Sequence, residues 1–405
     1  MRSFHGHVIH LMLSKLSFAV SGILFWYVAT RMYSVAEIGL ASALTSAASL
    51  ILFISFFCQT DTFVRFLPQS EKKETVFSTF VLFSLVMLGL ICFLSIMKAD
   101  LFFPDLQKDF TGLWKLYFVA YVLFFFIFQV LEGLLISFKH TDGVLLLTLT
   151  QNFLRIGMLV FLSAWGAAGI FWANGFGACA AVFLGGLFFL KKGWPLKWSA
   201  EFNPGIFQDL LPFSAVNFLN ASSTFLPGTL LPIFVLHLFS KQEAGFFYLP
   251  WMMFMIYASF FSTIMSVFVM KTSHGESPDA LWKKMVGSAS FVVIVGVLVF
   301  VLGAVPILAI FKKDFAEYSA ATLRILFSSF FFYPVHQIYT TLANVRRETA
   351  KVGVVSAVLM TSFIVFCFLF FPAGKIELFA WAWLAANAVT AGFVLFLIFF
   401  WKTKK

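Results

Sequence analysis

The chain has 405 residues, of which 61% are hydrophobic and 11% are charged, and its mean hydropathy is +0.95. This composition excludes a soluble globular protein, and the formal net charge of +10 indicates basic loops beside a membrane rather than nucleic-acid binding. The apolar runs are too long and continuous for the short alternating strands of a barrel, whereas a spanning helix needs about 20 such residues. The expected fold class is all-α integral membrane.

Twelve apolar segments follow one another along the chain, and each predicts a membrane-spanning helix. They cover residues 7–31, 36–66, 74–97, 114–138, 143–163, 167–190, 209–238, 242–270, 285–311, 318–344, 349–371 and 377–401. The longest polar connection, residues 191–208, separates an N-lobe of six spans (1–190) from a C-lobe of six spans (209–405). If the N-terminus is cytoplasmic, about twice as many basic residues lie inside as outside. We therefore expect 191–208 to be a cytoplasmic linker and both termini to be cytoplasmic.

The connection after the first span has a copy after the seventh. YSVAEIGL (Tyr33–Leu40) aligns with FSKQEAGF (Phe239–Phe246) at an offset of 206 residues. Without gaps, the identities extend over five positions: Gly22/Gly228, Leu24/Leu230, Ser34/Ser240, Glu37/Glu243 and Gly39/Gly245. A second patch, LISFKH (135–140) over LANVRR (342–347), aligns at an offset of 207. Ser-x-x-Glu is a helix-capping signature, so two separately capped helices remain an alternative to a true repeat. We favour a parallel repeat of two six-span halves.

Charged residues within the spans are costly and are therefore candidates for function. Arg155 lies mid-span with Gln151 and Asn152 on one polar face, and serves either substrate binding or a hydrogen-bonded anchor between helices. Lys15, in the first span, either lines a cavity or extends back to the membrane surface. Arg324, near the outer end of the tenth span, is more typical of an interfacial anchor than of a binding residue.

Acidic and histidine residues in the spans are the candidates for a coupling ion. Glu132 lies in the fourth span, and Asp61 precedes Arg65 by four residues, a spacing typical of a structural ion pair. His336 can titrate near neutrality, although a hydrogen-bonded histidine within the bundle is the simpler interpretation. Deep in the spans, the basic Lys15, Arg155 and Arg324 outnumber the acidic Glu132, which favours an anionic ligand over a cationic one.

The seventh span contains LPGTLLP, with Pro227, Gly228 and Pro232 close together. Proline removes a helical hydrogen bond, so this stretch predicts a bend that is either a flexible gate or a static kink. The four cysteines lie in apolar runs without metal-ligand spacing, and no nucleotide-binding loop or catalytic constellation is found. We expect no metal, no cofactor and no enzymatic activity.

Several segments, taken in order, resemble a known family. They are ATRMYSVAEIGLASAL (29–44), TFVRFLP (62–68), LEGLLISFKHTDGV (131–144), NFLRIGMLVFL (152–162), DLLPFS (209–214) and TTLANVRRETAKVG (340–353). They resemble polysaccharide and O-antigen flippases of the multidrug/oligosaccharidyl-lipid/polysaccharide exporter superfamily. The resemblance implies a two-lobe, MATE- or flippase-like transporter that moves lipid-linked oligosaccharides across the cell membrane by alternating access.

The resemblance also implies the partners. These are an oligosaccharide on polyprenyl phosphate or pyrophosphate and membrane lipids, without nucleic acid, and the transporter is expected to act as a monomer. Two rival functions remain: a cation- or proton-coupled multidrug antiporter of the same fold, and a membrane enzyme of polysaccharide assembly. The antiporter would favour acidic residues in the N-lobe, and the enzyme would favour a long outer loop or an acidic catalytic motif.

Overall fold

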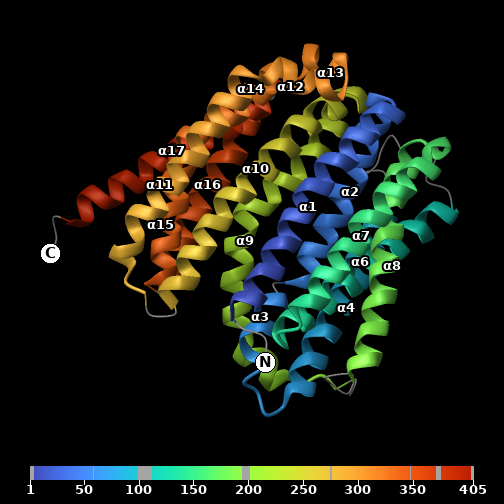
Figure 1. Ribbon diagram of the computed structural model, residues 1–405, viewed down its shortest axis with the longest axis vertical. Coiled ribbons are helices and arrows are strands. Elements are labelled where there is room, and N and C mark those ends of the chain that lie inside the picture. Colours follow the sequence, from blue (N-terminus) through green and yellow to red (C-terminus); the bar gives the residue numbers. More distant parts are fainter. Residues whose placement is uncertain are drawn as a thin grey trace. The chain divides into compact units, whose positions relative to one another are not determined.

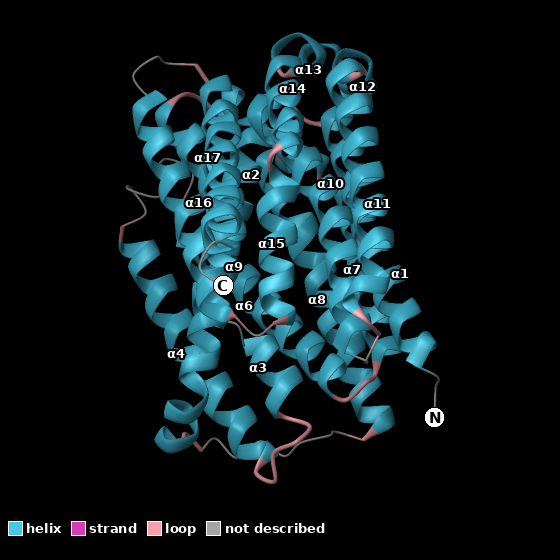
Figure 2. Ribbon diagram, turned by 90° about the vertical axis from the view of Figure 1, so that its left-hand side faces the viewer, coloured by secondary structure: helices cyan, strands magenta, loops and turns pink. Residues whose placement is uncertain are grey.

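The structure is a computed structural model, and it describes residues 4–57, 59–98, 112–193, 201–273, 276–346, 348–370 and 375–402. All regular secondary structure in these ranges is helical (Figures 1 and 2). Nine of the described helices are long and apolar enough to cross a membrane. Shorter apolar helices at Leu16–Met32, Phe225–Leu238 and Ala320–Phe331 correspond to the other three predicted spans. The predicted all-α membrane fold with about twelve spans is confirmed.

The chain divides into two compact units, Met1–Phe218 and Leu219–Lys405. The first unit contains α1 (Phe4–Met32), α2 (Val35–Phe56), α3 (Gln59–Phe66), α4 (Lys73–Met97), α6 (Gly112–Ser137), α7 (Thr141–Phe161), α8 (Ala167–Lys192) and the beginning of α9 (Pro204–Leu238). The second unit contains the rest of α9, α10 (Lys241–Ser273), α11 (Pro278–Val297), α12 (Ala304–Phe311), α13 (Lys313–Tyr318), α14 (Ala320–Ser328), α15 (Tyr333–Val345), α16 (Thr349–Phe370) and α17 (Glu377–Lys402).

The boundary between the units falls within α9, because the first half of this helix packs on the first unit. Ser214 Oγ lies 2.7 Å from Thr62 Oγ1, and the guanidinium of Arg65 lies 4.5 Å from the ring centre of Phe213. The rings of Phe53 and Phe218 stack at 4.9 Å. The lobe limits based on the linker 191–208 stay a prediction.

Three predicted spans are interrupted. Phe57 adopts a left-handed conformation (φ 42°) and separates α2 from α3 within the predicted span 36–66. A π-helical turn at Leu298–Leu302 interrupts the ninth span before α12. A 3₁₀ turn at Ser329–Phe331 separates α14 from α15, where Pro334 in the first turn of α15 cannot donate a backbone hydrogen bond. Apolar length predicts a span but not its internal breaks.

Helix limits in the two units repeat closely. The first residues of α2 and α10 are Val35 and Lys241, which are 206 positions apart, as the sequence alignment predicts. Shifting α6 by 208 residues gives 320–345, the limits of α14 through α15, and shifting α8 by 210 gives those of α17. The offset between the limits of α6 and those of α14 through α15 is thus 208 residues, one more than the offset of 207 in the sequence alignment of this region. Matching limits along most of both units support the internal repeat.

Candidate functional site

Among the described residues, hydrogen bonds join α1 and Tyr33, the residue after it, to α7, and we call these contacts the polar seam. His10 Nδ1 lies 3.3 Å from Thr141 Oγ1, and Asn152 Nδ2 donates to Ser17 Oγ at 3.2 Å. Arg155 Nη2 donates to Ser21 Oγ at 2.7 Å, and the Tyr33 hydroxyl donates to the Leu159 carbonyl at 2.7 Å. Residue numbers rise together along both helices, which therefore run parallel, and Figure 1 shows them side by side. Polar groups buried in an apolar protein need such partners.

Arg155 lies at the centre of the polar seam. Its side chain is buried (7% exposed), and its guanidinium carbon lies 5.2 Å from the ring centre of Phe18 and 5.5 Å from that of Phe25. Phe18, Ser21 and Phe25 have the i, i+3, i+7 spacing of one helical face. The Ser21 hydroxyl donates to the Phe18 carbonyl at 3.1 Å and so turns its oxygen toward Arg155. This face of α1 holds the cation by one hydrogen bond and two cation–π contacts.

The other side of α7 packs closely against α8. A Cβ atom added to Gly177 would lie 2.6 Å from the Gln151 carbonyl oxygen and 3.2 Å from Arg155 Cβ. Only glycine at this position allows the two backbones to approach so closely. Gly177 therefore sets the position of α7 from which Arg155 reaches α1.

The predicted polar face of α7 is buried. Gln151 is 4% exposed and Asn152 is 2% exposed. Asn152 Nδ2 bonds to Ser17, whereas its Oδ1 has no hydrogen-bond partner among the described residues. The structure thus brings Gln151, Asn152 and Arg155 together, as predicted, and adds Ser17, Phe18, Ser21 and Phe25 of α1.

The remaining basic candidates are Lys15 and Arg324. Lys15 belongs to α1, but its side chain lies outside the described residues. Arg324 lies in the second unit with an exposed side chain, and its Nε donates to the Val301 carbonyl of the π-helical turn at 3.2 Å. This contact agrees with an anchoring role for Arg324.

The coupling-ion candidates lie in different surroundings. Glu132 on α6 is half-buried, and the Asp61 side chain on α3 lies outside the described residues. His336 on α15 is buried, and its Nε2 lies 2.9 Å from Asn387 Oδ1 of α17. The Tyr333 ring lies edge-on to the His336 ring at 5.3 Å. Among the described residues, no group of three His, Cys, Asp or Glu side chains could hold a metal ion.

The proline-rich stretch lies in α9, which runs as one helix through Pro227, Gly228 and Pro232. Pro232 lacks the N–H that would bond to the Gly228 carbonyl in a regular helix. A Cβ on Gly228 would lie 3.8 Å from Trp251 Nε1, a buried indole nitrogen without a hydrogen-bond partner among the described residues. The proline-rich stretch therefore packs beside a buried donor without a partner among the described residues.

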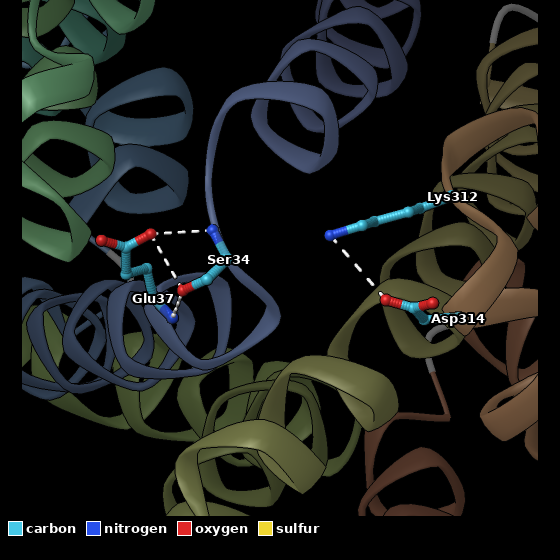
Figure 3. Close-up of polar contacts among 4 residues, drawn as sticks. All are labelled: Ser34, Glu37, Lys312 and Asp314. Atoms are coloured by element: carbon cyan, nitrogen blue, oxygen red, sulfur yellow. Dashed lines mark hydrogen bonds and ion pairs between the residues drawn. The ribbon is translucent and has the colours of Figure 1, made fainter.

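The turn between α1 and α2 carries the predicted capping box (Figure 3). Glu37 N–H donates to Ser34 Oγ at 3.2 Å, and Ser34 N–H donates to Glu37 Oε2 at 2.7 Å. In the second unit, Glu243 N–H likewise donates to Ser240 Oγ at 3.1 Å. Figure 3 also shows the ion pair of Lys312 and Asp314 at 3.8 Å, at the start of α13.

Tyr33 precedes this cap and is 4% exposed. Its hydroxyl donates to the Leu159 carbonyl, one of the last carbonyls of α7 and therefore without a partner within the helix. Burial, and secondarily the Glu37 carboxylate, raises the pKa of Tyr33 to about 12. Tyr33 therefore remains a neutral donor. It joins the end of α1 to the end of α7, which the predicted orientation places on the outer side of the membrane.

Sequence reasoning missed the α1 side of the site. Phe18 and Phe25 are two among 59 phenylalanines, so composition does not distinguish them. Only the spacing of two aromatic residues around Ser21 on one helical face was a usable signal. Gly177 gave no signal, because its importance depends on the neighbouring helix.

No protein-family model matches the chain, and no curated protein matches it. Solved structures of other proteins have the same fold. A structure titled "Lipid II flippase MurJ, inward closed conformation" is 15% identical and covers 97% of this chain and 87% of its own, with a TM-score of 0.74. The MATE multidrug transporter DinF-BH in complex with R6G is 16% identical, covers 98% and 94%, and has a TM-score of 0.67.

An inward-facing multidrug resistance MATE family transporter of the MOP superfamily is 14% identical and covers 96% of this chain and 92% of its own, with a TM-score of 0.63. At such identities the similarity concerns the fold, which flippases and drug transporters share. The chain has the fold of the MurJ and MATE structures.

Proposed function

We propose that the protein is a flippase that moves a lipid-linked oligosaccharide across the cell membrane by alternating access. It acts as a monomer with both termini in the cytoplasm, and it performs transport rather than an enzymatic reaction. Its substrate is an oligosaccharide on polyprenyl phosphate or pyrophosphate. The solved flippase structure titled for lipid II supports a lipid-linked substrate for this fold.

The observation that carries the proposal is the position of Arg155. A charged side chain at the centre of a spanning helix costs about 2.5–3.5 kcal/mol to insert, so a plain structural contact is better made by a neutral residue. Arg155 is held between two aromatic rings and beside the buried amides of Gln151 and Asn152. A guanidinium with neighbouring hydrogen-bonding groups is suited to phosphate oxygens.

The proposal also includes a site for a coupling ion and a hinge for the conformational change. Glu132, Asp61 and His336 are the candidates for binding the coupling ion. Pro227, Gly228 and Pro232 are the candidates for a hinge in α9. The Trp251 indole N–H supports the hinge, because it is a buried donor beside Gly228 that has no partner among the described residues.

The experiment uses purified protein in vesicles that contain a fluorescent, undecaprenyl-pyrophosphate-linked disaccharide. An impermeant reductant destroys the fluorescence in the outer leaflet, so flipping increases the fraction of label destroyed. We expect flipping above that of protein-free vesicles, at least a tenfold loss with Arg155→Met, and no loss with Phe153→Ala. Phe153 is the matched control, because it lies on α7 and is 73% exposed.

Two outcomes would contradict the proposal. Reduction no faster than in protein-free vesicles would exclude flipping of this substrate. Proton-driven accumulation of rhodamine 6G without lipid flipping would favour the antiporter, for which the solved MATE structures provide the fold precedent.

A further inference from the structure

Two aromatic rings lie against the guanidinium of Arg155, and they differ in how far they are exposed. Phe18 and Phe25 both lie against this cation, but Phe25 is 1% exposed whereas Phe18 is 51% exposed. Packing therefore fixes Phe25, whereas about half of the Phe18 side chain is not covered by other residues. Rotation of the Phe18 side chain would uncover the guanidinium without disturbing the packed face of α1.

A second buried group beside Arg155 lacks a partner. Asn152 precedes Arg155 by three residues, so both lie on the same face of α7. Its amide nitrogen Nδ2 donates to Ser17 Oγ. Its amide oxygen Oδ1 has no hydrogen-bond partner among the described residues, although Asn152 is only 2% exposed. A buried polar atom without a partner costs about 1–3 kcal/mol. The amide oxygen without a partner therefore indicates that a polar group of a ligand binds at the site.

We propose that Phe18 is a movable cover over a glycosyl-phosphate site, in which Arg155 binds the phosphate and Asn152 binds a hydroxyl of the attached sugar. A hydroxyl suits the amide in either orientation, because it can both donate and accept a hydrogen bond. The inference rests on the proposed function and deepens it. It assigns recognition of the first sugar to Asn152 and control of access to Phe18.

The Phe18 ring stabilises the charge of Arg155 until a ligand binds. In the empty site, the Phe18 ring contributes a cation–π contact to a charge that lies among apolar helices. An arriving phosphate replaces this contact with charge-assisted hydrogen bonds, which are stronger. Ligand and ring thus compete for the space beside the guanidinium, and removal of the ring should favour the ligand.

The test measures binding rather than transport. Isothermal titration calorimetry on the purified protein in detergent compares farnesyl phosphoryl-glucose with the same phosphodiester carrying a tetrahydropyranyl ring, which lacks hydroxyls. The two probes have equal charge. We expect wild-type protein to bind the glucosyl ester roughly 2- to 10-fold more tightly, because one net hydrogen bond has about that effect. Asn152→Leu should make the two affinities equal.

Phe18→Ala should increase the affinity for both probes by about 2- to 5-fold, the effect of an exposed cation–π contact. Phe153→Ala, which removes an exposed ring from α7, should change neither affinity. An unchanged affinity in Phe18→Ala would refute the cover. Equal affinities of wild-type protein for the two probes would refute the role of Asn152, and this comparison needs no variant that could fail to fold.

The outcome also separates this inference from the proposed function. Flipping by wild-type protein, together with equal affinities for the two probes, would overturn the inference and leave the flippase proposal intact. If the protein discriminates between the probes but does not flip the lipid in vesicles, the flippase proposal would be overturned and the binding inference would stand.

Discussion

The two units share their helix limits but differ in what lies at equivalent positions. With the offset of 208 residues between α7 and α16, Arg155 corresponds to Phe363, and Asn152 corresponds to Met360. Phe363 is 3% exposed and packs edge-on against the Trp383 ring at 5.7 Å. One unit therefore has a polar helix face where the other has an apolar one.

The neighbouring helix shows the complementary difference. With the offset of 210 residues between α8 and α17, Gly177 corresponds to Asn387, and Ala173 corresponds to Trp383. Small residues on α8 let α7 approach closely, whereas large residues on α17 fill the same space in the second unit. The same helical arrangement thus holds a charged residue between α7 and α1 in the first unit and packed aromatic rings between α16 and α17 in the second. This asymmetry agrees with the proposal of a ligand site in the first unit.

The largest expected effect comes from closing the space beside α7. Gly177→Ala places a Cβ 2.6 Å from the Gln151 carbonyl oxygen, a backbone atom that cannot move aside alone. We expect a loss of about 3 kcal/mol of stability from overpacking, with flipping reduced in proportion to the displacement of Arg155. Thermal unfolding in detergent and the vesicle assay measure the two effects.

Gly186→Ala is the matched control, because a Cβ at this position of α8 meets nothing within 4 Å. Equal unfolding temperatures for the two variants would show that the close approach of α7 and α8 is not required. Normal flipping by a stable Gly177→Ala protein would separate the position of α7 from the function of Arg155.

A smaller effect is expected from giving the second unit a residue of the first. His336 corresponds to Phe128 at the offset of 208 residues. His336→Phe removes the 2.9 Å contact with Asn387 Oδ1 and leaves that buried oxygen without the partner it has now. We expect a loss of about 1–2 kcal/mol of stability, measured by thermal unfolding. Flipping should keep its pH dependence if His336 is structural, and should lose it if His336 binds the coupling proton.

His237→Phe is the control for this substitution, because His237 lies on α9 in the same unit and is exposed. The double variant His336→Phe with Asn387→Gly restores the residue pair of the first unit. If it is no more stable than the single variant, the lost partner of Asn387 does not explain the destabilisation.

Local signals in the sequence predicted the scaffold but not the asymmetry. Apolar length predicted the spans, and Ser34 with Glu37 predicted the cap, because both depend on residues close in sequence. Phe57 carries no local sign of the left-handed conformation that interrupts the second span. Gly177 and Phe18 acquire their roles only from atoms of other helices, so a single sequence does not identify them. Arg155 stood out as a candidate because a charge in an apolar helix is costly wherever it packs.

The smallest expected effect concerns the turn before α2, where Tyr33 corresponds to Phe239 of the second unit at the offset of 206 residues. Tyr33→Phe removes the hydroxyl that donates to the Leu159 carbonyl and should cost about 1 kcal/mol of stability at neutral pH. The effect should depend on pH, because the pKa of Tyr33 is raised from 10.0 to about 12 in the folded protein. A raised pKa favours the protonated folded state, so its contribution is complete below pH 10 and is lost as the pH rises toward 12.

The stability difference between wild type and Tyr33→Phe should therefore shrink between pH 10 and 12, measured by thermal unfolding at each pH. Tyr318→Phe is the control, because Tyr318 is 55% exposed and should show a smaller difference at every pH. A difference that is constant from pH 8 to about 12 would mean that the Tyr33 proton is not held by its buried contact. The polar seam would then end at Arg155 instead of extending to the turn, and the first unit would match the second at this end of α1.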